Sequence, residues 1–165
     1  MKHINLKHAI ALGLLLSTSG GIPAFAADMN IADFNAQGTD ITVNENTHVE
    51  GNGNFNLGEH TDNSIDGKNI NVAADTTLSF HNVQILKPNI TGSGDISIVI
   101  DKQVNGAGIQ VNGNITADSL SIDTSKTASV KGIYTYGGDV NIDVNELSIT
   151  ANSHGIFTTE DAKSD

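Results

Sequence analysis

The chain has 165 residues, with 19 acidic and 8 basic side chains, a formal net charge of −11 and no Cys. All the basic residues are Lys, so the chain lacks the cationic surface that neutralises phosphates, which argues against nucleic acid and anionic membrane surfaces as partners. Without disulfides, its stability must come from extended strand pairing.

Residues 1–26 have the pattern of a cleavable export signal. A basic start with Lys2 and Lys7 is followed by an apolar run over residues 9–16, which is too short to span a bilayer. Small residues follow at the exit, so we expect cleavage after position 26, a cell-surface or extracellular location, and a mature charge of 6 − 19 = −13. The residues around the expected cleavage point are Ala24, Phe25, Ala26 and Ala27.

Residues 27–64 show less order than the rest of the chain. Residues 40–43 read as a short strand, residues 51–57 are rich in Gly and Asn, and no repeated phrase is visible. The region is predicted to be an entry region, either the atypical first coils of a repeat array or the cap that such an array needs.

Alternating apolar and polar residues dominate from about residue 65 onward. Ile96, Ile98 and Ile100, for example, alternate with Ser97 and Val99. Such short runs, bounded by Gly, Asn, Asp and Ser, predict short strands. No stretch after the export signal keeps a helical period for three turns, so the chain is predicted to be all-β.

Two phrases recur at almost the same step. The aliphatic-Ser-Ile triplet repeats at steps of 120 − 96 = 24 and 147 − 120 = 27, and the Gly-Ile pair at 132 − 108 = 24 and 155 − 132 = 23. The triplets are Ile96-Ser97-Ile98, Leu120-Ser121-Ile122 and Leu147-Ser148-Ile149, and the pairs are Gly108-Ile109, Gly132-Ile133 and Gly155-Ile156. Repetition at this period is typical of arrays whose units bury their apolar faces against one another.

The period favours a right-handed parallel β-helix over residues 65–165, with about 23–27 residues per coil, because a sandwich has no reason to repeat one phrase at this step. Equivalent side chains should then stack, with Ile109 on Ile133 and Gly113 on Gly137. The Gly-Ile pairs are interpreted as the repeat turns. The frequent Asn residues, such as Asn69 and Asn82, either form internal amide ladders or adopt left-handed turn geometry.

No motif for catalysis, cofactor binding or metal binding is found, so no such site and no cofactor is predicted. The histidines expected in the mature chain stand at no ligand spacing and are interpreted as surface residues; they are His48, His60, His81 and His154. Two alternatives remain. An acid pair for glycan cleavage could come from Asp95, Asp101, Asp118, Asp123, Asp139 and Asp143. Calcium could bind at residues 92–96 or 137–140, which partly match the calcium repeat of secreted toxins.

The segment Gly132-Ile133-Tyr134, then Gly137-Gly138-Asp139-Val140-Asn141-Ile142, Leu147-Ser148-Ile149 and His154-Gly155-Ile156 resembles the passenger repeats of bacterial autotransporters and related large adhesins. The resemblance covers about residues 94–157. It implies a Gram-negative surface passenger that a C-terminal outer-membrane barrel moves to the cell surface, with roles in adhesion, aggregation or biofilm formation. The chain has no such barrel or linker helix, so we expect that it is truncated at its C-terminus or, alternatively, that it is exported by another route.

The leading expectation is a non-enzymatic β-solenoid that acts as a stalk and an interaction surface. The expected partners are host or neighbouring-cell surface molecules and a second copy of the chain, with membrane attachment only through the missing translocator. The alternatives are a β-helical enzyme acting on surface polysaccharide and a calcium-stabilised surface-coat component.

Overall fold

The computed structural model describes residues 27–51, 64–102, 106–110, 113–136 and 140–159. The expected export signal, residues 1–26, lies outside these residues, and Ala27, which follows the expected cleavage point, begins the first strand. His60, Gly137 and Asp139 also lie outside them. Among the residues that the structure describes, no helix has the length and apolar character needed to cross a membrane.

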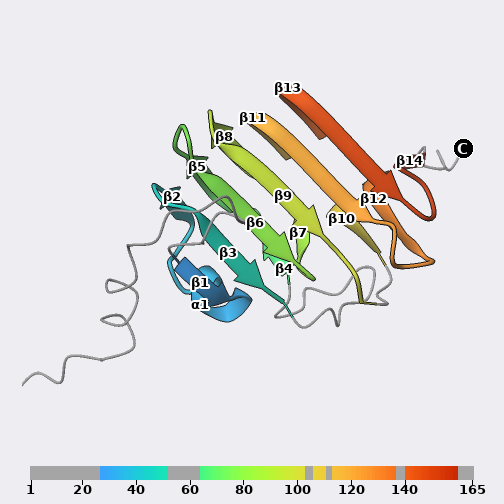
Figure 1. Ribbon diagram of the computed structural model, residues 1–165, viewed down its shortest axis with the longest axis horizontal. Helices are drawn as coiled ribbons and strands as arrows, with labels where there is room; N and C mark the ends of the chain where they lie inside the picture. Colours follow the sequence, from blue (N-terminus) through green and yellow to red (C-terminus); the bar gives the residue numbers. More distant parts are fainter. Residues whose placement is uncertain (1–26, 52–63, 103–105, 111–112, 137–139, 160–165) are drawn as a thin grey trace, which may run out of the picture.

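The described residues form two parallel sheets and one short helix, which confirms the expected all-β class (Figure 1). The nine-stranded sheet runs in the order β1-β3-β6-β9-β11-β8-β5-β2, with β13 added beside β11, and is curled. Its strands are β1 (Ala27–Asn30), β2 (Asp40–Val43), β3 (Thr47–Glu50), β5 (Asn69–Val72), β6 (Thr77–His81), β8 (Asn89–Gly92), β9 (Asp95–Val99), β11 (Gly113–Thr124) and β13 (Val140–Ala151). The five-stranded sheet contains β14 (Ile156–Thr159), β12 (Val130–Tyr136), β10 (Gly106–Gln110), β7 (Gln84–Leu86) and β4 (Ser64–Asp66), in that order.

The repeated phrases align in neighbouring parallel strands, as predicted. Ile96 pairs with Leu120, and Leu120 pairs with Leu147, so the three aliphatic-Ser-Ile triplets lie in register across β9, β11 and β13. Ile109 pairs with Ile133, which confirms the stacking expected for these two residues. Like side chains therefore lie next to one another, in the arrangement that the 24-residue step predicts.

Two of the three Gly-Ile pairs lie inside strands and not at turns, which corrects that interpretation for them. Gly108-Ile109 and Gly132-Ile133 lie inside strands β10 and β12, and Gly155-Ile156 leads directly into β14. The glycine serves close approach: a Cβ on Gly132 would lie 2.5 Å from the carbonyl oxygen of Gly155 and 2.6 Å from Cγ2 of Ile149. Gly132-Ile133 thus combines a buried Ile with a position that has no room for a side chain.

A second correction concerns Gly113, which was expected to lie over Gly137. Gly113 pairs with Val140, a step of 140 − 113 = 27. The preceding strand keeps the shorter step, because Ile109 pairs with Ile133 at 133 − 109 = 24. Three extra residues thus enter the sequence between Ile133 and Val140, which shifts the register of β13.

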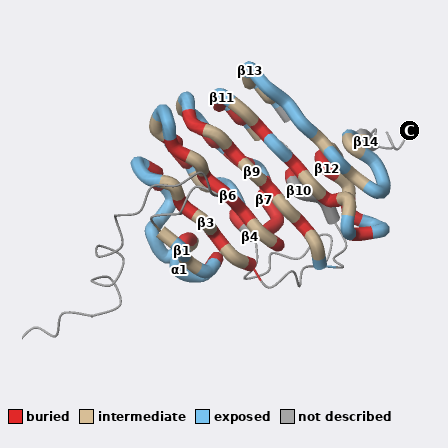
Figure 2. The backbone as a smooth tube through the Cα atoms, in the orientation of Figure 1, coloured by how far each residue is buried: buried red, intermediate tan, exposed pale blue. Residues whose placement is uncertain are grey.

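Columns of buried aliphatic side chains form the core between the two sheets. Figure 2 shows buried positions interspersed with less buried ones along the central strands, and mainly exposed or intermediate positions on β13. Each column contains one residue from each successive strand, and burial of such side chains stabilises the fold by about 1.5–3 kcal/mol each. Two of these columns are Ile65, Ile85, Ile109 and Ile133 in the five-stranded sheet, and Leu78, Ile96 and Leu120 in the nine-stranded sheet.

The region 27–64 contributes strands that extend the two ladders and a short helix that packs against the core. β2 and β3 pair with β5 and β6, so they extend the same ladders. The helix α1 (Ile31–Asn35) was not predicted, since five residues are too few to show a helical period; it begins where the Asn30 side chain accepts a hydrogen bond of 2.9 Å from the backbone N–H of Asp33. Phe34 of α1 is fully buried and meets the Phe80 ring edge-on at 5.7 Å, so the helix packs against the core.

Candidate functional site

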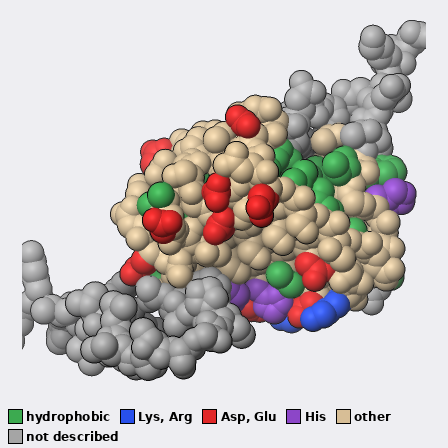
Figure 3. All heavy atoms as spheres, turned by 45° about the horizontal axis from the view of Figure 1, so that its top comes forward, with side chains coloured by type: hydrophobic (Ala, Val, Ile, Leu, Met, Phe, Trp, Pro, Cys, Tyr) green, Lys and Arg blue, Asp and Glu red, His purple; other side chains and the backbone are tan. Residues whose placement is uncertain are grey.

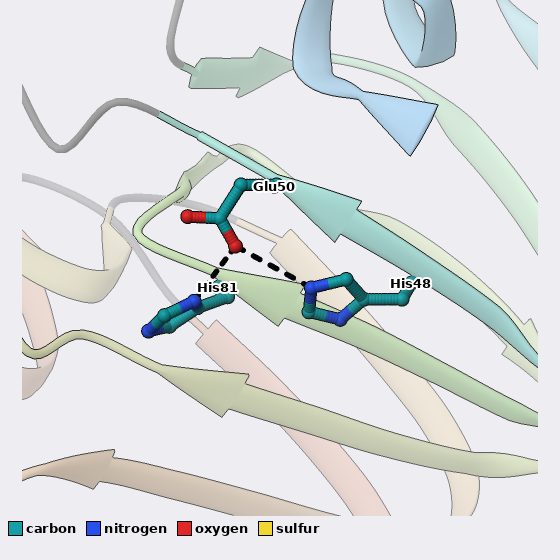
Figure 4. Close-up of side chains that lie close together, drawn as sticks. All are labelled: His48, Glu50 and His81. Atoms are coloured by element: carbon teal, nitrogen blue, oxygen red, sulfur yellow. Dashed lines mark hydrogen bonds and ion pairs between the residues drawn. The ribbon is translucent and has the colours of Figure 1, made fainter. Parts of the chain in front are cut away.

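His48, Glu50 and His81 come together on the outer face of the nine-stranded sheet (Figure 4). His48 and Glu50 lie two residues apart on β3, so their side chains leave the same face of the strand. Glu50 pairs in register with His81 of the adjacent β6. Backbone register thus places one histidine on each side of a single carboxylate.

The Glu50 carboxylate is the centre of this cluster. Its Oε2 lies 2.7 Å from Nδ1 of His81 and 3.4 Å from Nε2 of His48. The other oxygen, Oε1, lies 4.0 Å from Nζ of Lys102. All three side chains are only partly exposed, so their interactions are screened less than those of freely exposed charges.

A second carboxylate, Asp101, lies against the other nitrogen of His81. Its Oδ2 is 3.1 Å from Nε2 of His81. Its Oδ1 accepts a hydrogen bond of 3.0 Å from the side-chain amide of Asn82. The amide of Asn82 and then the adjacent His81 ring hold the pKa of the Asp101 carboxyl below its ordinary value, although partial burial opposes them.

Asn82 fixes this arrangement from a left-handed backbone conformation. Its φ is 55° and its side chain is fully buried. The amide oxygen of Asn82 accepts hydrogen bonds of 3.1 Å from the backbone N–H groups of both Asp101 and Lys102. Of the two alternatives for the Asn residues, Asn82 therefore follows the left-handed one, and it also ties the end of β6 to the segment after β9.

His48 and His81 lie on the outer face, partly exposed, as expected for surface residues, but they also meet at one carboxylate, which the sequence did not predict. That expectation describes His154 more fully, since this exposed residue contacts its neighbour Ser153 at 3.0 Å and the ring of Phe157 at 5.0 Å. His48-x-Glu50 was the one available signal, because residues two apart share a face of a strand. His81 could not be added to it, because no repeated phrase in residues 27–64 gives the register across 31 positions.

The acidic residues considered for glycan cleavage mainly bind neighbouring segments of the chain. Asp95 accepts a hydrogen bond of 2.6 Å from Ser119, and Asp118 accepts one of 2.8 Å from Asn145. Asp123 binds the hydroxyl of Ser125, which contributes to a lowered pKa of the Asp123 carboxyl. Acidic side chains are scattered over the face shown in Figure 3, with histidine and lysine beside acids at its lower edge. The remaining acid of known position, Asp143, is exposed on β13.

An exposed column of amides runs across the outer surface of the ladders. The side chain of Asn89 donates to Asn69 at 2.7 Å, and Asn69 donates to Asp40 at 2.7 Å. Asn114 and Asn141 continue the column in register on β11 and β13. The structure thus contains a side-chain amide ladder of the kind considered above, but on the exterior.

The end of the ladders at β13 and β14 presents apolar and aromatic side chains. Among the described strands, β13 pairs only with β11 and β14 only with β12. Leu147 is 49% exposed and Ile156 is 58% exposed. In the five-stranded sheet, the rings of the paired residues Tyr134 and Phe157 stack at 5.6 Å, and Nζ of Lys131 lies about 5 Å from both ring centroids.

The first segment considered for calcium has a structural role for its glycine. Gly92 adopts φ +131° and lies against the backbone of Val72, where a Cβ would not fit. This accounts for Gly92 in packing terms, and calcium binding at residues 92–96 stays a prediction.

Comparisons of the chain with protein-family models, with curated protein sequences and with solved structures each find no match.

Proposed function

We propose that the chain is a non-enzymatic segment of an exported surface protein, wound as a right-handed parallel β-helix that acts as a stalk and an interaction surface. The β-helix accounts for the order in which the strands follow one another. β5 and β6 in one sheet are followed by β7 in the other, and β8 and β9 are then followed by β10. β11 followed by β12, and β13 followed by β14, repeat this order.

The observation that carries the proposal is the nearly constant step between paired strands. In the five-stranded sheet, Ile85, Ile109, Ile133 and Ile156 pair in succession at steps of 109 − 85 = 24, 133 − 109 = 24 and 156 − 133 = 23. A chain that meets itself in parallel after each such step is a winding chain, because a hairpin would reverse the strand direction. The first step, from Ile65 to Ile85, is 20 residues, which is consistent with a shorter coil.

Two surfaces support a role in interaction. The exposed amide column provides regularly spaced hydrogen-bonding groups along the side of the ladders. The β13 and β14 end provides strand edges and partly exposed aliphatic groups, to which another strand can add. We propose that this end binds a second copy of the chain and that the sides bind surface molecules of host or neighbouring cells.

The cellular setting rests on the sequence. The basic and apolar start of residues 1–26 supports export, and the resemblance to autotransporter passengers supports display at a Gram-negative cell surface. The charge of the chain, −11, suits a surface molecule that repels its neighbours until a specific contact forms.

Cells that display the full-length protein should clump, or bind host glycoprotein, more than cells that lack it. For self-association, sedimentation of the purified chain should show a concentration-dependent dimer that Leu147→Glu weakens. Thr116→Glu adds the same charge at an exposed position of β11 and should leave the dimer intact. Equal clumping and binding with and without the protein would remove the adhesive function.

A further inference from the structure

We propose that His48, Glu50 and His81 form a binding site for a divalent ion of the Zn²⁺ class. One ligand atom from each of the three residues lies within 4.8 Å of the other two. The two contacts with Glu50 point to Nε2 of His48, Oε2 of Glu50 and Nδ1 of His81 as the ligand atoms. This site is independent of the proposed stalk and interaction function. It depends only on the register of β3 and β6.

The donor set selects the class of ion. Two imidazole nitrogens and one carboxylate oxygen suit Zn²⁺ and its neighbours Ni²⁺ and Cu²⁺, whereas Ca²⁺ and Mg²⁺ prefer oxygen ligands. Zn²⁺ in a tetrahedral site, with ligand bonds of 2.0–2.2 Å, places ligand atoms about 3.3 Å apart. The separation of Nε2 of His48 from Oε2 of Glu50 is 3.4 Å, and the 2.7 Å contact of His81 with Glu50 needs only a small widening.

Asp101, the second carboxylate beside His81, bears on which ring nitrogen carries the proton. Nε2 of His81 lies 3.1 Å from Asp101, so a proton on Nε2 can be donated to that carboxylate. In the neutral ring, Nδ1 then carries a lone pair that faces Oε2 of Glu50 at 2.7 Å. In that tautomer, the Nδ1 lone pair and the Glu50 carboxylate face one another and can ligate one metal ion; without the metal, a proton on Nδ1 donates to Glu50 instead.

A carboxylate behind a metal-binding histidine is the arrangement that fixes the tautomer and orientation of the ring. Asp101 lies in this position, against Nε2 of His81, and is itself held by the hydrogen bond that Asn82 donates to its Oδ1. Asp101 would therefore be a positioning residue. The metal would bind Nδ1 of His81 while the proton stays on Nε2.

The local charge favours a dication. Two carboxylates, Glu50 and Asp101, lie against His81, and Nζ of Lys102 lies 4.0 Å from Glu50. The positive charge of Lys126 acts on Asp101. Lys102 is more than half exposed, so its contact with Glu50 is a weak competitor.

The test uses the complete untagged chain, stripped of metal with a chelator and titrated with ZnCl₂ at pH 7.5 by calorimetry. His3 and His8 are present in every variant, so the result is the difference between variants. His81→Gln should weaken the cluster's Zn²⁺ binding at least tenfold, whereas His154→Gln, at the other end of the ladders, should leave it unchanged. Asp101→Asn should weaken it about 10–100-fold while circular dichroism shows the fold retained.

Nitrogen-15 spectra of the histidine rings provide a readout that does not depend on heat or on activity. Saturation with Zn²⁺ should move the Nδ1 resonance of His81 and leave Nε2 protonated, and it should raise the melting temperature, because the ion binds two strands of the folded chain. Either of two results would overturn the proposal: equal Zn²⁺ affinity of the wild-type chain and His81→Gln, or a doubly protonated His81 ring that saturating Zn²⁺ does not displace. If His81→Gln is unfolded, Glu50→Gln, which keeps the shape of the side chain, must give the same loss of binding.

Discussion

Substitution of two Ile residues of one column, one buried inside it and one at its exposed end, tests the energetics of the stacked core. Ile85 and Ile156 belong to the same column of the five-stranded sheet, but Ile85 is 0% exposed and Ile156 is 58% exposed. Ile→Ala at the buried position removes three carbon groups at about 0.8 kcal/mol each, or about 2.4 kcal/mol, before any cavity forms. With the cavity between the neighbouring strands, the expected loss for Ile85→Ala is about 3–4 kcal/mol.

The matched change at the end of the column should be much smaller. With 100 − 58 = 42% of Ile156 covered, Ile156→Ala should lose about 1 kcal/mol and leave no closed cavity. Urea unfolding followed by circular dichroism gives the free energy of unfolding of each variant, and an unchanged m-value shows that the two can be compared. Equal losses of unfolding free energy for Ile85→Ala and Ile156→Ala would contradict this prediction, because they would show that Ile156 is buried as deeply as Ile85.

Three further predictions follow from single contacts. Gly132→Ala should destabilise the chain by about 1–3 kcal/mol in urea unfolding, since its Cβ would lie 2.5 Å from a backbone oxygen. In the control Gly155→Ala, the new Cβ would lie no closer than 3.5 Å to another residue, so the loss of stability should be far smaller. A larger loss for Gly155→Ala than for Gly132→Ala would contradict the packing argument. Ser125→Ala should raise the pKa of the Asp123 carboxyl toward its ordinary 3.8, measured by carboxyl NMR. Because the pKa of Asp123 is lower in the folded chain, its interaction with Ser125 stabilises the fold fully above pH 3.8, and this stabilisation is lost as pH falls through the folded pKa. Ser125→Ala should therefore lower stability at neutral pH and much less in strong acid. An unchanged pKa of Asp123 in Ser125→Ala would exclude the serine as the cause. Phe34→Ala should lose about 3–5 kcal/mol, because the ring is fully buried against the core, and a loss below 1 kcal/mol would mean that the helix does not cover it.

The ladder of residues after about 65 was predictable because its phrases carry their own register. The triplets ending in Ile98, Ile122 and Ile149 place the same side chain at the same point of successive strands, so counting residues is enough to pair them. The interpretation of Gly132 as a turn residue was wrong because glycine marks two different situations, a turn and a close approach of backbones. For Gly132, only the structure distinguishes the two, because it places the carbonyl oxygen of Gly155 2.5 Å from where a Cβ would lie.

The histidine cluster could not be predicted by counting. Glu50 meets His81 across 81 − 50 = 31 residues, a longer step than the 20–24 residues between later strands of the five-stranded sheet. The helix α1 was missed for a related reason: its formation depends on the Asn30 cap and on the burial of Phe34, and neither produces a period in so short a segment.

Backbone NOEs between β9 and β11 test the parallel winding most directly. Parallel pairing predicts contacts of Asp95 with Ser119, Ile96 with Leu120 and Ile98 with Ile122, so the residue numbers keep a constant difference of 120 − 96 = 24 along both strands. Contacts whose residue numbers keep a constant sum, as in antiparallel strands, would contradict it.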